Sequence, residues 1–402
     1  MQRRNFIKTT LGGFSLLSPK ILFLKTQGKY STEVPKASLE RKRARELGIR
    51  IGDQAPGPSN AITDVKGVRV GHTTVMKGKG KGAVRTGVTA ILPNNGKIYE
   101  ENLYASYFNL NGWGEMTGIA PLEKTGRLKT PIFLTGTYNV GIVYDAAVDY
   151  LTQNFRGLEN SEDIAQPIVG ECFDDFLSDT KRRMISKEDV FQAIKNARSG
   201  PVEEGSVGGG TGMVSFGFKG GIGTSSRIVS IKKDEYTVGV LVMANTASRR
   251  QLRIDGLPVG KEIKGFKSRY GKSKSIILIA ATDAPLLPFQ LKKIAKRVAI
   301  GLAQTGATSN TGSGDIILAF STGNKIPRNL SATFLQTRAI NDFWITPLYT
   351  ATVEATHEAI INALTSARTI TGRDGNTAFG LPLDQVKKII KKYREPGENY
   401  FD

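Results

Sequence analysis

The sequence predicts a layered α/β fold in which helices cover buried sheets. Two continuous apolar runs, 238–244 and 276–281, have the length of strands and lack polar alternation, which is typical of strands buried on both faces. A helix pattern follows the second run: Pro285 and Pro288 precede apolar positions at helical spacing over 291–302. Because strand and helix patterns alternate irregularly and no internal repeat is present, we expect one domain in which helices pack on sheets.

The first half of the chain contains shorter candidate elements. A charged helix is predicted over 38–48, which Ser38 can cap and Gly48 can end. After it, turn residues alternate with short apolar segments, and Ser186 is a plausible cap for the last helix of this half. We expect strands near 65–70, 88–92 and 131–134, and helices over 139–151 and 186–198.

Two segments of the second half predict loops. Residues 205–212, GSVGGGTG, are too rich in glycine for the interior of a helix or strand, so the backbone there should pass close to another group. The segment lacks the spacing of a phosphate-binding P-loop, which argues against a nucleotide site. Residues 259–274 are basic and polar and are expected to be the most loop-like internal segment. Further elements are expected as a strand at 316–320 and helices over 351–366 and 383–393.

Residues 1–30 predict an export signal followed by a linker. Arg3 and Arg4 precede Phe6, Ile7 and Lys8, a pattern that resembles a bacterial twin-arginine signal. The apolar stretch behind it is interrupted by a proline and a lysine, so we expect no stable membrane insertion. The expected location is therefore periplasmic or otherwise exported.

The formal charge of +20 raises the question of a nucleic-acid partner. Six basic residues and no acidic residue lie in the leader, and the other basic residues are scattered without a recognition motif. We therefore expect a basic solvated surface and no nucleic-acid binding.

Cysteine and histidine are scarce. The single cysteine, Cys172, lies in an apolar stretch and is expected to be a small buried side chain. Of the two histidines, His72 is expected to be structural, and His357 is expected on the surface of a helix. This scarcity argues against a Ser-His-Asp triad and against a metal site built from several histidines, and we expect neither a metal nor another cofactor.

Ser275 is the first residue of a predicted buried strand and follows the basic loop. If the bond before it is cut, its α-amine becomes free, with a pKa of about 7.7–8.0. Such an amine can act as general base for its own hydroxyl near neutral pH. From position alone, an ordinary serine at a strand edge is the commoner explanation.

Several blocks of sequence change this assessment. They are GVRVGHTTV, NGWGEMTG, GGGTGM, FKGGIGTSSR, ANTASRRQLRIDGLPVG, SIILIAATDAPLLPFQL and GSGDIILAFSTGN. In this order, from about residue 46 to about residue 384, they resemble the DmpA-type L-aminopeptidase/D-esterase family, which includes the β-peptidyl aminopeptidases. The resemblance implies a four-layer αββα sandwich, like that of the ornithine acetyltransferases. It also implies a chain that cuts itself before the serine of the SIIL block.

Carried over motif by motif, the resemblance implies roles for five residues. Ser275 would be the nucleophile, and Asn245 would donate an amide N–H to the oxyanion, worth about 2.7–4 kcal/mol in comparable sites. Ser313 and Asp315 would form hydrogen bonds around the nucleophile. Glu171 would bind the free amino group of the substrate, since a carboxylate pairs with an ammonium. The structural alternatives are a turn cap at Asn245, turn residues at Ser313 and Asp315, and no role at all for Glu171.

Two positions depart from the family pattern. Phe173 stands where a tyrosine or tryptophan is expected, so a phenol that would help to hold the oxyanion is missing. Lys274 precedes the nucleophile, where glycine or asparagine is common. Self-cleavage is helped by a strained peptide bond, which glycine tolerates better than lysine. We therefore expect cleavage between Lys274 and Ser275, but more slowly.

The resemblance implies a serine aminopeptidase or amidase acting on short peptides or amino-acid amides or esters. A single catalytic domain, 38–402, would be processed into chains 38–274 and 275–402 and would form a homo-oligomer, by resemblance a tetramer of such pairs. One alternative is an acyltransferase of the ornithine acetyltransferase type, although that family uses threonine as nucleophile. The other alternative is a catalytically silent binding relative.

Overall fold

The computed structural model describes residues 41–155, 164–266, 268, 274–328 and 333–394, which belong to one compact unit. The helices are α1 (Ile119–Thr125), α2 (Val140–Asn154), α3 (Lys187–Lys195), α4 (Val259–Glu262), α5 (Pro288–Gln304), α6 (Thr346–Thr365) and α7 (Leu383–Arg394). The strands are β1 (Arg69–Lys77), β2 (Val84–Leu92), β3 (Glu101–Gly112), β4 (Arg127–Leu128), β5 (Ile132–Gly136), β6 (Ile168–Cys172), β7 (Val214–Ser215), β8 (Phe218–Lys219), β9 (Gly221–Ile231), β10 (Asp234–Asn245), β11 (Lys274–Thr282), β12 (Ser313–Pro327), β13 (Ile370–Thr371) and β14 (Thr377–Ala378).

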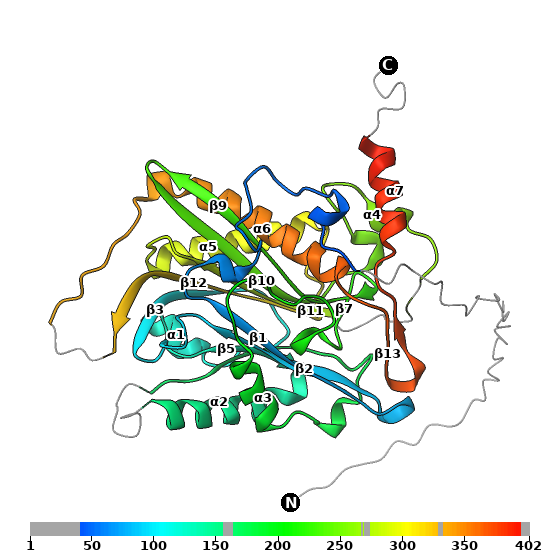
Figure 1. Cartoon of the computed structure of the whole chain (residues 1–402), viewed down its shortest axis with the longest axis horizontal. Coiled ribbons are helices and arrows are strands. Elements are labelled where there is room, and N and C mark those ends of the chain that lie inside the picture. The colour runs from blue at the N-terminus through cyan, green and yellow to red at the C-terminus, as the bar shows by residue number, and fades with distance from the viewer. Residues whose placement is uncertain (1–40, 156–163, 267, 269–273, 329–332, 395–402) are drawn as a thin grey trace, which may run out of the picture. The chain divides into compact units, whose positions relative to one another are not determined.

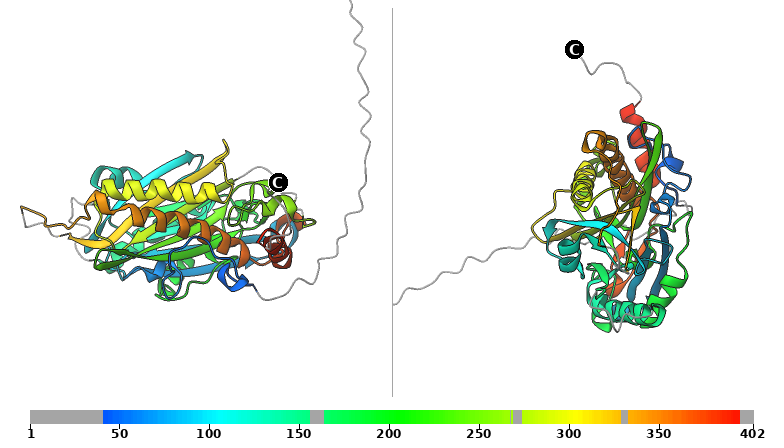
Figure 2. Two further views of the ribbon diagram at one scale, coloured as in Figure 1. Left: turned by 90° about the horizontal axis from the view of Figure 1, so that it is seen from above. Right: turned by 90° about the vertical axis from the view of Figure 1, so that its left-hand side faces the viewer.

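Two sheets form the centre of the unit. One has four strands in the order β1-β2-β5-β6, and the other has six in the order β4-β3-β12-β11-β10-β9. Helices α5 and α6 lie on the outer side of the six-stranded sheet, and α2 and α3 lie on the outer side of the four-stranded sheet (Figure 1). The end-on view shows the same succession of helices, two sheets and helices (Figure 2, right). The expected four-layer αββα arrangement is confirmed.

Alternation along β11 shows how the layers are held together. Ile276 and Leu278 pack into the core under α5 and α6, whereas Ile277 and Ile279 pack into the core between the two sheets. Both sides of the strand are thus apolar, which is why its sequence reads as an unbroken apolar run. A third core, which includes Phe133 of β5, lies between the four-stranded sheet and helices α2 and α3.

Most of the predicted elements are present, with shifted ends. The strand predicted at 88–92 is β2, and the two apolar runs are β10 and β11. The predicted helix over 186–198 is α3, and Ser186 caps it by accepting a hydrogen bond from the backbone N–H of Asp189. The corresponding prediction over 139–151 is α2, and those over 351–366 and 383–393 are α6 and α7.

The helix predicted over 38–48 is wrong where the structure describes it. From residue 41 onward there is only a 3-10 turn, Arg45–Leu47, although it does end at Gly48, whose φ of 79° suits glycine. The reason is tertiary: the backbone N–H of Ala44 donates to Asn362 Oδ1, and arginines of this segment reach acceptors in distant strands and helices. Contacts outside the segment thus outweigh its helix propensity.

The sequence did not reveal the long strands β3 and β9. Strand β9 reads GIGTSSRIVSI, whose glycines and serines are typical of a loop, and the hydroxyls of Ser225 and Ser226 form hydrogen bonds with the N-terminal segment. The predicted loop 259–274 contains the short helix α4, and part of it lies outside the described residues. The placement of His357 on a helix surface is also wrong, because α6 is covered on nearly every side and His357 is buried. Cys172 is buried, as expected.

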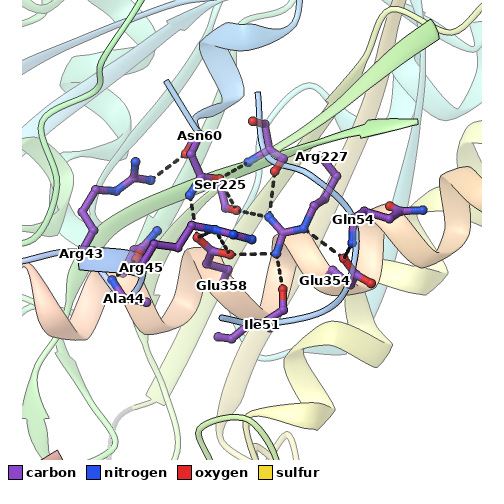
Figure 3. Close-up of polar contacts among 12 residues, drawn as sticks. Arg43, Ala44, Arg45, Ile51, Gln54, Asn60, Ser225, Arg227, Glu354 and Glu358 are labelled. Carbon is purple, nitrogen blue, oxygen red and sulfur yellow. Dashed lines mark hydrogen bonds and ion pairs between the residues drawn. The ribbon is translucent and has the colours of Figure 1, made fainter. Parts of the chain in front are cut away.

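A buried network of charges joins β9, α6 and the N-terminal segment (Figure 3). Arg227 is fully buried and donates to Glu354, to Glu358 and to the carbonyl of Ile51. Arg45 forms a second ion pair with Glu358 at 2.9 Å. Through these contacts the network holds the segment before β1 against β9, the edge strand of the six-stranded sheet, and against α6. None of the helices described is both long enough and apolar enough to cross a membrane.

Candidate active site

Ser275 lies where several strand ends meet. In the six-stranded sheet it is opposite Asn245, the last residue of β10, and beside Gly314, near the start of β12. Its side chain is 5% exposed, and its Oγ accepts a hydrogen bond from the backbone N–H of Gly314 at 3.2 Å. The sheet therefore fixes the Ser275 hydroxyl in a nearly closed space between the two sheets.

Two contacts orient the amide of Asn245. The backbone N–H of Val214 donates to Asn245 Oδ1 at 2.8 Å, so the oxygen must face Val214. The nitrogen Nδ2 donates to the carbonyl oxygen of Phe173 at 3.0 Å. Nδ2 carries two N–H groups, and one of them is left over by this arrangement. Asn245 thus has the donor that an oxyanion requires, beside Ser275.

Ser313 and Asp315 form a pair on β12, on either side of Gly314. The hydroxyl of Ser313 donates to Asp315 Oδ1 at 2.6 Å, and both side chains are buried. Burial raises the pKa of Asp315, and its hydrogen bond from Ser313 opposes the shift. The pair flanks the residue that holds the Ser275 hydroxyl, although no hydrogen bond joins either side chain to Ser275 directly.

Glu171 lies near the end of β6, in the other sheet. One carboxylate oxygen accepts from the backbone N–H of Glu115 at 2.9 Å, and the other accepts from the hydroxyl of Thr137. Burial raises the pKa of Glu171, while the Thr137 and Glu115 hydrogen bonds oppose the shift. The carboxylate is thus held in a fixed orientation by two donors.

Gly114 shows that Glu171 and Ser275 belong to one site. A Cβ added at Gly114 would lie 3.2 Å from Glu171 Oε1 and 3.2 Å from the Cα of Gly314. A side chain would be crowded there from both directions, so the Glu171 carboxylate lies close to β12 at Gly314, the residue whose N–H donates to Ser275. Gly114 and Thr137 are not among the predicted site residues, because their contacts with Glu171 join segments far apart in the chain.

A further carboxyl group lies nearby. Asp174 is buried, and its Oδ2 has no hydrogen-bond partner. Burial raises the pKa of Asp174 to about 7, and Glu171 contributes to the shift as a like charge. No cationic side chain that the structure describes lowers the pKa of Glu171, Asp174 or Asp315. The site is therefore acidic and suits a substrate that carries a positive charge.

The glycine-rich loop lies against the protein's own sheets. Gly208 and Gly209 donate their backbone N–H groups to the hydroxyls of Thr74 and Thr89. A Cβ at Gly209 would lie 2.6 Å from the carbonyl oxygen of Leu134, which explains glycine there. His72 also contacts Thr89, in keeping with a structural role. Among the described residues, no cluster of three or more His, Cys, Asp or Glu side chains is arranged to hold a metal ion.

Comparison with known proteins places this site in a family. The family model for peptidase family S58 matches residues 60–378. The chain belongs to peptidase family S58. It is 42% identical over 379 residues to the β-peptidyl aminopeptidase BapA of Sphingosinicella microcystinivorans, covering 89% of this chain and 94% of that protein.

Solved structures agree with this assignment. The β-aminopeptidase of a Burkholderia species has a TM-score of 0.82 and 40% identity, covering 89% of this chain and all of that one. The L-aminopeptidase D-Ala-esterase/amidase of Ochrobactrum anthropi, described as a prototype for the serine aminopeptidases and a variant of the Ntn hydrolase fold, has a TM-score of 0.83 and 37% identity. It covers 87% of this chain and 98% of that one. This S58 chain is a serine aminopeptidase or amidase, and the acyltransferase alternative is not favoured.

Proposed function

We propose that this S58 peptidase cuts itself before Ser275 and then uses Ser275 to release unblocked N-terminal residues from short peptides, amino-acid amides or esters. The observation that carries the proposal is the convergence of three groups. These are a fixed serine hydroxyl at the start of β11, an amide donor opposite it, and a buried carboxylate beside Gly314.

The self-cleavage step needs only the chain itself. Ser275 Oγ attacks the carbonyl carbon of Lys274, an ester forms, and the bond to the Ser275 nitrogen breaks. Water then hydrolyses the ester, leaving a carboxylate on Lys274 and a free amine on Ser275. In register, the backbone of Lys274 pairs with Ser313, so the bond to be cut is held at the end of the sheet. The new amine can afterwards serve as general base.

Substrate hydrolysis would use the same hydroxyl. Ser275 Oγ attacks the substrate carbonyl carbon and gives its proton to the free α-amine, while the free N–H of Asn245 donates a hydrogen bond to the oxyanion. The amine or alcohol then leaves with that proton, and water hydrolyses the ester of the acyl-enzyme. The Ser313–Asp315 pair keeps Gly314 and its N–H in place behind the nucleophile. Phe173 contributes only its backbone carbonyl, to Asn245, because it has no phenol hydroxyl.

Glu171 is proposed to bind the substrate's ammonium group. Its two oxygens already accept two hydrogen bonds, and a carboxylate has room for more. The relatives named β-peptidyl aminopeptidase and β-aminopeptidase support N-terminal β-residues as substrates of this chain too. Unblocked α- and β-aminoacyl p-nitroanilides should be cleaved, and N-acetylated ones should be cleaved much more slowly. Equal rates on blocked and free substrates would contradict the role of Glu171.

Ser275→Ala tests the proposal most directly. The wild type should give two bands on a denaturing gel, with the smaller fragment beginning Ser-Ile-Ile-Leu. The variant should stay one uncut chain without activity. A fully active wild type that remains a single intact chain would refute the mechanism.

Export and assembly are part of the same proposal. The Arg3-Arg4 leader supports passage to the periplasm, and replacing both arginines by lysine should leave the precursor in the cytoplasm. We propose a closed homo-oligomer, a tetramer of cut pairs by resemblance, because most soluble oligomers are symmetric. Light scattering that gave the mass of one cut pair would contradict this assembly.

A further inference from the structure

Lys219 is a buried cation that the site described so far does not use. Its side chain is fully buried at the end of β8, yet no carboxylate among the residues that the structure describes pairs with it. Instead, Nζ donates to three backbone carbonyl oxygens, those of Gly210 at 2.9 Å, Met213 at 2.9 Å and Gly220 at 2.8 Å. An ammonium group has three N–H donors, so each is matched by one acceptor.

Two of these carbonyls, those of Gly210 and Met213, belong to the turn that leads into β7, and the third, that of Gly220, directly follows β8. Gly210 and Met213 close the glycine-rich loop, and Val214 follows directly as the first residue of β7. In the β7–β8 hairpin, Lys219 is the cross-strand partner of Val214. The ammonium thus fixes the turn on one side and the hairpin on the other, and Val214 lies between them.

Val214 connects this turn to the active site. Its N–H is the donor that holds Asn245 Oδ1, and this contact decides which way the amide faces. If the turn opened, the amide could rotate and present its oxygen instead of its N–H to the oxyanion. The hairpin also contacts the residue after Asn245, since the N–H of Phe216 donates to the carbonyl of Thr246 at 2.7 Å.

We propose that Lys219 is a positioning residue for the oxyanion donor: its ammonium gathers three carbonyls, which fixes the Val214 N–H and thereby the orientation of Asn245. The inference rests on the proposed function, because it takes Asn245 as the donor to the oxyanion.

Electrostatics explains why a cation is required. Three carbonyl oxygens that point at one place repel each other unless a positive group lies between them. Burial lowers the pKa of Lys219 to about 7. A neutral side chain of similar length would fill the volume and leave the carbonyls without donors.

The experiment compares Lys219→Met with a matched control, Asn102→Leu. Asn102 is also buried and also donates to two loop carbonyls, those of Ile98 and Tyr99, but it pairs with Ile326 at the far end of β12. Hydrolysis of an unblocked p-nitroanilide is measured per molecule of cut enzyme, together with Tm. Lys219→Met should lower kcat about 100-fold with little change in KM. Asn102→Leu should lower Tm and leave kcat near the wild-type value.

A double variant separates positioning from stability. Asn245→Ala alone should lower kcat by a factor of about 10²–10³. Adding Lys219→Met to it should change kcat by no more than about twofold, since Lys219 acts through a group that is already gone. Losses that multiply, or an unchanged kcat in Lys219→Met, would overturn the inference. A control variant with the same loss of kcat as Lys219→Met would overturn it too.

Two further outcomes are distinguishable. If Asn245→Ala keeps the wild-type rate, the proposed function fails at its oxyanion donor, and the inference fails with it. If Lys219→Met does not fold, Lys219→Gln still offers two N–H donors, and it should give a loss of about tenfold in kcat. A wild-type kcat in Lys219→Gln, measured alongside a strong loss in Asn245→Ala, would overturn the role of Lys219 alone.

Discussion

Around Arg227, two buried carboxylates face one guanidinium, whereas no cationic side chain that the structure describes lowers the pKa of the three buried carboxyl groups around Ser275. Every nitrogen of the Arg227 guanidinium donates to at least one acceptor, as the dashed lines around it in Figure 3 show. At the site, Oδ2 of Asp174 is buried without a hydrogen-bond partner. The guanidinium of Arg227 thus compensates the buried carboxylates of the network, whereas the carboxyl groups of the site are left for a cationic group of the substrate.

Arg227→Met should destabilise the fold by removing the cation at the centre of the buried network. It leaves Glu354 and Glu358 buried without their main cation, which should cost about 3–5 kcal/mol of unfolding free energy. The midpoint of urea denaturation should fall, while kcat per folded molecule stays the same. Adding Glu354→Gln and Glu358→Gln should restore part of the loss. A variant with wild-type stability would show that the network is not needed for the fold.

Glu171→Gln should reduce activity and leave the fold intact. Loss of the charged partner should lower kcat/KM for unblocked substrates about 10- to 100-fold, the effect of one charge-assisted hydrogen bond of about 1.5–3 kcal/mol. N-acetylated substrates should be little affected, so the preference for a free amine shrinks. Tm should not fall, since a buried carboxylate without a cation is replaced by a neutral amide. A fall in Tm with unchanged selectivity would make Glu171 structural.

Asp174→Asn should leave the structural network intact and change the pH dependence of stability. Burial raises the pKa of Asp174 from 3.8 to about 7, so the folded state favours the neutral form. Stability from this group is therefore complete below the unfolded pKa and is lost as pH rises through about 7. Relative to the variant, the wild-type Tm should decline between about pH 4 and pH 7 and then run parallel. Parallel curves from pH 4 upward would contradict this environment for Asp174.

Strands that are buried on both faces could be predicted from the sequence. Elements whose position depends on polar contacts with distant segments could not. Strands β10 and β11 are apolar on both faces, and so their sequences identify them. Strand β9 was missed because its Ser225, Ser226 and Arg227 satisfy their hydrogen bonds with the N-terminal segment and α6, which local sequence cannot show. His357 was misplaced for a related reason, since nothing in the helix sequence reveals that both of its sides are covered.

The candidate site divides in the same way. The sequence and the resemblance named Ser275, Asn245, Ser313, Asp315 and Glu171, and the structure brings the strands that carry them together at one end of the two sheets. The partners that orient them could not be predicted. Thr137 bonds Glu171, 34 positions away, Val214 bonds Asn245, 31 positions away, and Lys219 bonds backbone carbonyls, which any residue carries. Sequence motifs therefore identify the nucleophile more readily than the residues that orient the groups around it.

The position of the proposed cut has a consequence for refolding. Arg227 and strand β10 precede residue 274, whereas their partners Glu354, Glu358 and strand β11 follow it. Once the bond before Ser275 is broken, the network and the centre of the six-stranded sheet join two separate polypeptides. Unfolding then releases two chains that must find each other again, so recovery becomes a bimolecular, concentration-dependent process. The precursor can fold as one connected chain, and the mature enzyme persists mainly through the slowness of its unfolding.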